Sequence, residues 1–193
     1  MTRGAAPPAL GAESLEGRTI RERPDRAEPA TALRHAGWEA VHAGLACGIT
    51  TAFAGDFGIS GTTVDALLDA YLGLARREGF PRVVVGRQVH GVVVRALAAG
   101  APTGDDEPAL LVVSRADGLL ALEPGLLLAV TAADCVPVHL LDPVARRAAL
   151  LHAGWRGTAG GILERAVRAI RDAGSRLDDL HLHLGPAICG RCY

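Results

Sequence analysis

The chain has 193 residues, of which 49% are hydrophobic and 21% are charged, and its formal net charge at pH 7 is −1. This length suits one domain with a sizeable core, and the near-neutral charge gives no indication of a nucleic-acid or anionic membrane surface. The longest apolar stretch is interrupted by Glu123, Pro124 and Gly125, so a membrane span is not expected.

The N-terminal residues are rich in Pro, Ala, Arg and Glu and show no hydrophobic period. Such a segment cannot bury enough apolar surface to fold, so we expect a disordered extension over residues 1–36 and one α/β domain over residues 37–193. His35-Ala-Gly-Trp38 repeats a tetrapeptide found later in the chain and is interpreted as a chance match. The acidic residues argue against a transit peptide, and the cysteines suit a reduced, cytoplasmic protein.

Short apolar runs and two amphipathic segments follow from Trp38 onward. Apolar residues recur at helical spacing over Thr63–Glu78 and Thr158–Ala173, which predicts two helices. Asp142-Pro143 is a turn signal and predicts a hairpin between the strands that flank it. The predicted strands are Val41–Leu45, Arg82–Val85, Gly91–Leu97, Leu110–Val113, Leu126–Thr131, Val136–Leu141, Ala148–His152 and Leu180–Leu184. Together these elements predict an α/β domain with a sheet of mixed strand direction.

Three side chains that commonly bind metals follow predicted strands. His90 lies in Gln-Val-His-Gly, Cys135 lies in Ala-Asp-Cys-Val-Pro, and His152 opens His-Ala-Gly-Trp-Arg-Gly. One edge of a sheet can bring these positions together. Two imidazoles and a thiolate suit Zn²⁺, and three protein ligands leave a fourth position open, as in catalytic zinc sites. The sequence therefore predicts a zinc site formed by His90, Cys135 and His152.

Other polar residues lie in the same three motifs. Asp134 is a candidate for orienting a ligand histidine or for acid–base catalysis. Arg156, beside several glycines at the start of a helical segment, is a candidate phosphate-binding residue, and the alternative is a surface arginine. Gln88 either hydrogen-bonds the substrate or ends its strand. Trp155 either stacks on a base or fills the core.

Two further motifs lie near the C-terminal end of the sequence. Cys189-Gly-Arg-Cys192 is a candidate redox pair or half of a zinc knuckle, and the alternative is a loop that carries two thiols. His181 and His183 are expected on the polar face of a strand whose leucines face the core, because side chains alternate along a strand.

The three metal-ligand motifs, in this order and together with Gly185-Pro-Ala-Ile188, resemble those of the YfiH-like family. That family was labelled multicopper polyphenol oxidoreductase, or laccase domain, and is described as zinc-containing purine nucleoside phosphorylases. The resemblance covers residues 45–193 and implies a layered α/β/β/α sandwich with a cysteine-hydrolase-like fold. It also implies that His90, Cys135 and His152 are the zinc ligands. Members continue beyond the last motif, so the domain is expected to lack its usual C-terminal part.

The resemblance implies phosphorolysis of adenosine, inosine and related purine nucleosides by inorganic phosphate, with adenosine deamination as a further activity. One alternative is a cysteine hydrolase with Cys135 as nucleophile and His152 as base. Another is an inactive, truncated metal-binding remnant. Copper oxidase chemistry is not expected, because it needs several His-x-His pairs and this chain has one, with Met1 as its single methionine. The sequence does not indicate an oligomeric state.

Overall fold

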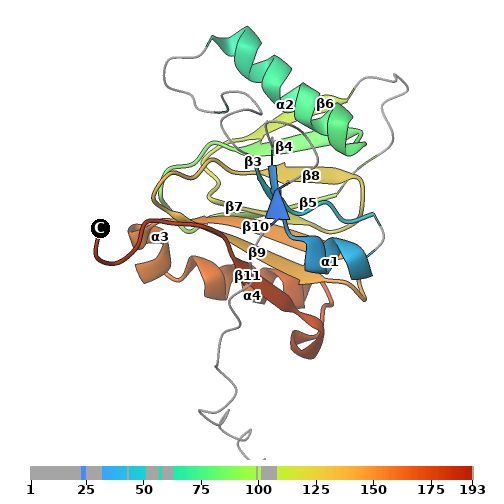
Figure 1. Cartoon of the computed structure of the whole chain (residues 1–193). Coiled ribbons are helices and arrows are strands. Elements are labelled where there is room, and N and C mark those ends of the chain that lie inside the picture. The colour runs from blue at the N-terminus through green and yellow to red at the C-terminus, as the bar shows by residue number, and fades with distance from the viewer. Residues whose placement is uncertain are drawn as a thin grey trace, which may run out of the picture.

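The computed structural model describes residues 23–24, 32–42, 44–50, 57, 63–98, 100 and 108–192. These residues form four layers, α/β/β/α (Figure 1). The first two layers are helix α2 (Val64–Glu78) and a sheet in the order β6 (Ala109–Val113), β4 (Arg82–Gly86) and β8 (Leu126–Ala129). The third is a sheet in the order β11 (His181–Leu184), β9 (Val136–Asp142), β10 (Arg147–Ala153), β7 (Gly118–Ala121) and β5 (Val94–Leu97), and α4 (Ile162–Asp172) covers its outer face.

Strand direction differs between the two sheets. In the small sheet β4 is parallel to both neighbours, whereas in the large sheet β9 and β10 form the predicted antiparallel hairpin and β5 is parallel to β7. The layered fold and the mixed strand direction expected from the sequence are therefore confirmed. Strand β7 was not predicted, because its four residues are all apolar or glycine and show no alternation that would indicate a strand.

Side chains on the two faces of β4 pack against the layers on either side, helix α2 and the large sheet. Val83 packs on Tyr71 and Ala75 of α2, and Val84 packs between the sheets against residues such as Leu119. Burying each such side chain contributes roughly 1.5–3 kcal/mol. On the other side of the large sheet, α4 packs on buried residues of β7 and β10, and this cluster includes Leu120, Leu151, Ile162, Ala166 and Ile170.

One of the two predicted helices is confirmed, and the other is divided in the structure. α2 begins after Thr63, whose side chain accepts a hydrogen bond from the Ala66 N–H group, and ends at Gly79 in the left-handed conformation, close to the prediction. The predicted helix Thr158–Ala173 is instead two helices, α3 (Trp155–Ala159) and α4. They separate at Gly160–Gly161, where Gly161 has φ +81° and a Cβ on Gly160 would lie 2.7 Å from Val92 Cγ1.

The N-terminal part of the domain differs from the prediction. β1 (Arg23–Pro24), β2 (Ala32–Arg34) and β3 (Gly48–Thr50) form a third sheet, so disorder is wrong for residues 32–36. Residues 1–22 and 25–31 lie outside the described residues, and there the prediction is untested. The predicted strand Val41–Leu45 is wrong, because α1 (Ala36–Val41) and a turn occupy it.

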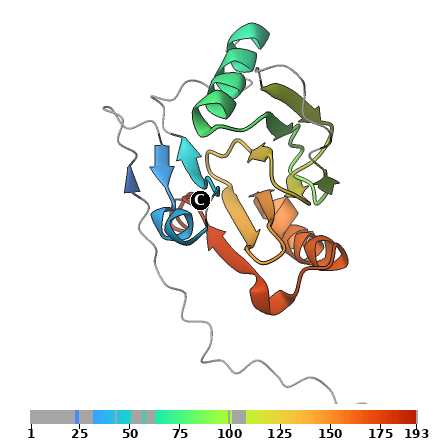
Figure 2. The same cartoon turned by 90° about the vertical axis from the view of Figure 1, so that its right-hand side faces the viewer.

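His35-Ala-Gly-Trp38 lies at the start of this helix, and its interpretation as a chance match to the later motif stays a prediction. The His35 ring accepts a hydrogen bond from the Trp38 N–H group and thereby caps α1. Helix α1 lies beside β11 (Figure 2), and the Trp38 ring lies 6.2 Å from the His181 ring and 6.1 Å from the His183 ring. His183 is 8% exposed and its ring lies 4.6 Å from the His35 ring, whereas Leu182 and Leu184 are exposed, so the prediction is wrong for these three residues. His181 is exposed and Leu180 packs against the core, as expected.

No helix in the described part of the chain is long and apolar enough to cross a membrane.

The buried histidine cluster predicts acid sensitivity. Burial, together with the nearby His183 and His35, lowers the pKa of His139 to about 4 from an ordinary 6.5. The unfolded chain therefore takes up this proton first, and stability present above pH 6.5 is lost as the pH falls toward 4. We expect this proton to lower the free energy of unfolding by about 3 kcal/mol over that range.

Urea unfolding between pH 7 and pH 4.5 measures this effect through tryptophan fluorescence. His139→Gln removes the titrating ring and should flatten the dependence over this range. An equally steep loss of stability in His139→Gln would show that other groups cause it.

Candidate metal centre

The chain passes from the small sheet to the large sheet in three crossover loops, residues 87–93, 114–117 and 130–135. His90 lies in the first and Cys135 in the last, and His152 lies near the end of β10 at the same edge. One ligand atom from each of the three lies within 4.8 Å of the other two. The structure therefore brings together the three residues that the sequence predicted as metal ligands, and this group could hold a metal ion.

A buried carboxylate organises the two imidazoles of this group. Asp117, in the second crossover loop, is fully buried, and its Oδ1 lies 3.0 Å from Nδ1 of His152. With Nδ1–H donating to Asp117, Nε2 of His152 is left free to bind a metal. A carboxylate in this role fixes the tautomer and the orientation of a ligand imidazole.

Asp117 also holds the backbone of the first crossover loop. Its carboxylate accepts hydrogen bonds from the N–H groups of Val89, His90 and Gly91, with N–O distances of 2.8–3.2 Å. His90 has φ +57°, a left-handed conformation that costs a non-glycine residue on the order of 1 kcal/mol. These hydrogen bonds stabilise that conformation.

The charge of Asp117 is maintained by the same contacts. Burial alone would raise the pKa of Asp117, but the hydrogen bonds from His152 and from the three backbone N–H groups lower it below its usual value. The carboxylate is therefore ionised and accepts hydrogen bonds from both ligand-bearing segments.

Gln88 joins the first and third crossover loops. Its Nε2 donates to the Thr131 carbonyl at 2.7 Å, and its Oε1 accepts from the Thr131 N–H at 2.8 Å. Gln88 thus positions the loop of Cys135 relative to that of His90. The predicted substrate contact of Gln88 stays a prediction.

Gly154 leaves the space that the ligand side chains occupy. A Cβ at this position would lie 3.0 Å from Cys135 Sγ and 3.1 Å from His90 Cδ2. Only glycine fits there without displacing one of the two, which gives the glycine of the His-Ala-Gly motif a steric role.

The structure does not give Asp134 the orienting role suggested for it. Asp134 is exposed, and the His152 ring donates its hydrogen bond to Asp117 instead. The Cys135 thiol is partly buried, and burial, with the charges of Asp134 and Asp117, raises its pKa. An acid–base role for Asp134 stays a prediction.

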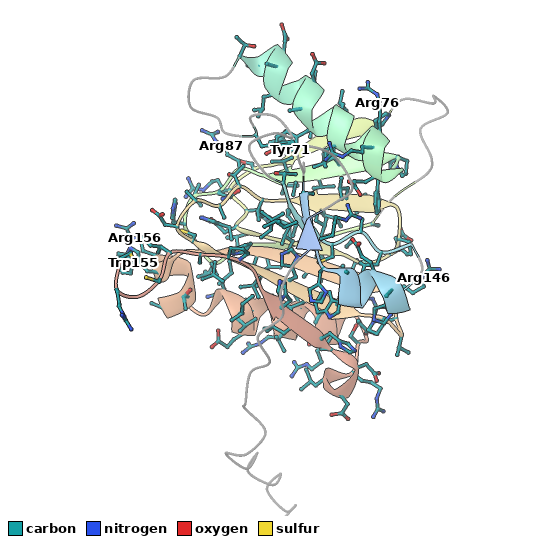
Figure 3. The ribbon with its side chains drawn as sticks, viewed as in Figure 1. Tyr71, Arg76, Arg87, Arg146, Trp155 and Arg156 are labelled. Carbon is teal, nitrogen blue, oxygen red and sulfur yellow. The ribbon has the colours of Figure 1, made fainter. Side chains whose placement is uncertain are left out.

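Arg156 and Trp155 lie on the surface at the start of α3. Figure 3 shows both at the edge of the molecule, and the Arg156 guanidinium stacks over the Trp155 ring at 4.6 Å. Trp155 is 58% exposed, so it does not fill the core. The exposed Arg156 is accessible to an anion.

A cavity of about 1320 Å³ opens onto the metal-binding group. His90, Cys135 and His152 line it together with Gln88 and Asp134, and Arg156 does not. The cavity extends along the large sheet beyond the group, and its volume exceeds that of most small-molecule sites, roughly 300–1,000 Å³.

Asp117 is the site residue that the sequence analysis missed. The available signal was an Asp-Gly pair directly before an apolar run, a pattern more common in turns. Only its complete burial, at a point where three chain segments meet, distinguishes it from a turn residue.

Several known proteins are similar to this chain in sequence. It is 46% identical over 112 residues to a purine nucleoside phosphorylase of Streptomyces coelicolor, covering 58% of this chain and 43% of that protein. A Deinococcus radiodurans purine nucleoside phosphorylase is 41% identical, with 66% and 45% covered. An adenosine deaminase from an unknown prokaryotic organism is 35% identical, with 67% and 51% covered.

Solved structures with a similar fold are also known. YlmD from Geobacillus stearothermophilus superposes with a TM-score of 0.72 at 30% identity, covering 89% of this chain and 67% of that one. The YfiH protein of Bacillus licheniformis gives 0.68 at 29% identity, with 84% and 64% covered. The chain thus spans about half the length of the curated relatives it matches. The family model described as "Multi-copper polyphenol oxidoreductase laccase" matches residues 61–193, and the chain therefore belongs to this family, which includes the YfiH and YlmD proteins.

Proposed function

We propose that this chain is a zinc-dependent purine nucleoside phosphorylase of the cytoplasm, acting on adenosine, inosine and related nucleosides with inorganic phosphate. The observation that carries the proposal is the convergence of His90, Cys135 and His152 at the mouth of a cavity. The relatives named purine nucleoside phosphorylase supply the reaction class. The free thiols suit a reducing compartment.

The donor set fits zinc. Tetrahedral coordination at ordinary Zn–N and Zn–S bond lengths places ligand atoms about 3.5 Å apart, and small side-chain movements from the present spacing achieve this. Two imidazoles and one thiolate are borderline-soft ligands, and the accessible His90 side leaves room for an open position. A bound zinc ion would supply Lewis-acid polarisation of a substrate oxygen.

Four residues of the chain have separate roles in the proposed phosphorolysis. Phosphate oxygen attacks the anomeric carbon of the ribose while the bond to the purine breaks. In this proposal the exposed Arg156, outside the cavity lining, attracts the phosphate, and Asp134, which lines the cavity, exchanges a proton with the substrate. Asp117 and Gln88 keep the loops in position, so the reactants meet in a fixed geometry.

Adenosine deamination is a second candidate, favoured by the relative named adenosine deaminase. It differs from phosphorolysis in needing water in place of phosphate. Inosine formation from adenosine without phosphate distinguishes the two.

The choice between a zinc enzyme and a cysteine hydrolase rests on Cys135. We expect zinc-loaded protein to convert inosine and phosphate to hypoxanthine, and we expect Cys135→Ala to lower both zinc content and turnover, because water does not replace a thiolate at equal affinity. Hypoxanthine release and metal analysis measure the two quantities.

Chelation and alkylation then separate the mechanisms. Turnover should stop after zinc is chelated and resume when it is restored. Turnover that survives chelation and fails only when Cys135 is alkylated would establish the cysteine nucleophile. No turnover of any purine nucleoside by zinc-loaded protein would leave only a metal-binding remnant.

Asp117 and Asp134 form a matched pair for testing the site. Asp117→Asn keeps the size of a buried side chain that contacts His152 and His90, and should weaken zinc binding by about 10–100-fold. Asp134→Asn alters an exposed carboxylate and should leave zinc affinity within about threefold.

Competition with a chromophoric chelator gives both dissociation constants without an activity assay, and circular dichroism confirms that each variant is folded. Equal zinc affinity in the two variants would contradict the role assigned to Asp117.

Arg156→Ala tests the phosphate contact. Removing a charged hydrogen-bond donor should raise the KM for phosphate by roughly 10–100-fold, with a small change in the KM for inosine. Arg176→Ala, beyond the far end of α4, removes another exposed arginine as the control. An unchanged phosphate KM in Arg156→Ala would place the phosphate site elsewhere.

A further inference from the structure

We propose that Cys189 and Cys192 form a reversible redox site that exchanges with small-molecule disulfides and closes into an intramolecular disulfide. This inference is independent of the proposed phosphorylase activity. It concerns a pair of residues that neither the metal centre nor the phosphate contact uses.

The geometry of the pair is close to that of a bond. Both thiols are free and exposed, and their sulfur atoms lie 3.1 Å apart. The Cys192 N–H donates to the Cys189 carbonyl at 2.9 Å, which closes the four residues into a turn. Sulfur atoms in a disulfide are about 2.05 Å apart, so a movement of about 1 Å completes the bond.

The two thiols are not equivalent. A hydrogen bond from the Cys192 thiol, followed by hydrogen bonds from the backbone N–H groups of Arg191 and Cys192, lowers the pKa of Cys189. The same partner raises the pKa of Cys192. Cys189 is therefore the attacking residue and Cys192 the resolving one, because the thiolate is the nucleophile in exchange.

Thiol–disulfide exchange at this site has two steps. The Cys189 thiolate attacks one sulfur of a low-molecular-weight disulfide, and the disulfide bond breaks to release one thiolate and leave a mixed disulfide. Cys192 then loses its proton to solvent and attacks the Cys189 sulfur, which expels the second thiolate. The dithiol is oxidised by two electrons, and the small disulfide is reduced to two thiols.

The turn is anchored beside the metal-binding group. The Ile188 N–H donates to the Asp134 carbonyl at 3.2 Å, and the Gly185 N–H donates to the Pro137 carbonyl at 2.9 Å. The segment before the cysteines is thus hydrogen-bonded to the chain on both sides of Cys135. This attachment keeps the pair exposed and holds the turn in place.

The remaining cysteines do not share these features. Cys47 is buried beside His139, and Cys135 is partly buried among the ligand histidines. Exposure and thiolate character together favour reaction at Cys189.

Oxidised glutathione is the probe, applied to the zinc-loaded full chain. We expect the loss of two hydrogens by intact mass. Because trypsin cleaves after Arg191, the oxidised site should join two tryptic peptides that reduction separates. Gly190→Ala is the control, since a Cβ there meets no atom within 4 Å and oxidation should proceed as in the parent chain.

A single variant tests the assigned roles. Cys192→Ser should hold a stable glutathione adduct at Cys189, because no resolving thiol remains, whereas the parent chain should release glutathione and form the intramolecular disulfide. No adduct in Cys192→Ser, or an equally stable adduct in the parent chain, would overturn the assignment of Cys192 as the resolving residue. Adducts confined to Cys47 or Cys135, or a dithiol that stays reduced in the parent chain, would overturn the redox site itself.

Discussion

The hydrogen bonds of one buried carboxylate determine the geometry of the metal-binding group. Asp117 is completely buried, and an ionised group in that position is costly unless its oxygens are hydrogen-bonded. Its partners are the His152 ring and three consecutive N–H groups around His90. The requirement to satisfy this charge therefore fixes an imidazole on β10 and the backbone of a loop from another sheet.

The placement of the loops follows from the connection between the sheets. Three crossovers from the small to the large sheet lie at one edge, and each carries one residue of this arrangement: His90, Asp117 and Cys135. Hydrogen bonds between crossovers, such as those of Gln88 with Thr131, join them without any regular element. The layers supply rigidity, while the loops supply the chemistry.

Much of the site could be predicted because ligand residues are chemically distinctive. His90 and Cys135 follow strands whose apolar runs are clear, and His152 lies near the end of another. Helix α2 has both its capping residue and its terminal glycine. Asp117 could not be predicted, because its role depends on contacts with residues that lie 26 to 28 positions away in one segment and 35 positions away in another. β7 was missed because its short sequence, Gly-Leu-Leu-Ala, shows no alternation of apolar and polar residues.

The errors at the N-terminal side share another cause. Strand β2 is three residues long, and α1 is six, so neither repeats its hydrophobic pattern often enough to be recognised. Their stability comes from packing on distant residues, as where His35 meets His183. Local composition gave a disordered segment, whereas tertiary contacts order part of it. The same contacts bury His183 of β11, so Leu182 and Leu184 face solvent where the sequence predicted the opposite.

The crossover arrangement also has a consequence for the order of folding. The hydrogen bonds that hold the ligands join residues 27, 35 and 43 positions apart, so none of them can form within a single local element. Non-local contacts require loop closure before they contribute, and they form slowly. The metal-binding geometry is therefore acquired only after the two sheets have docked, and a nascent chain exposes these ligands separately until then.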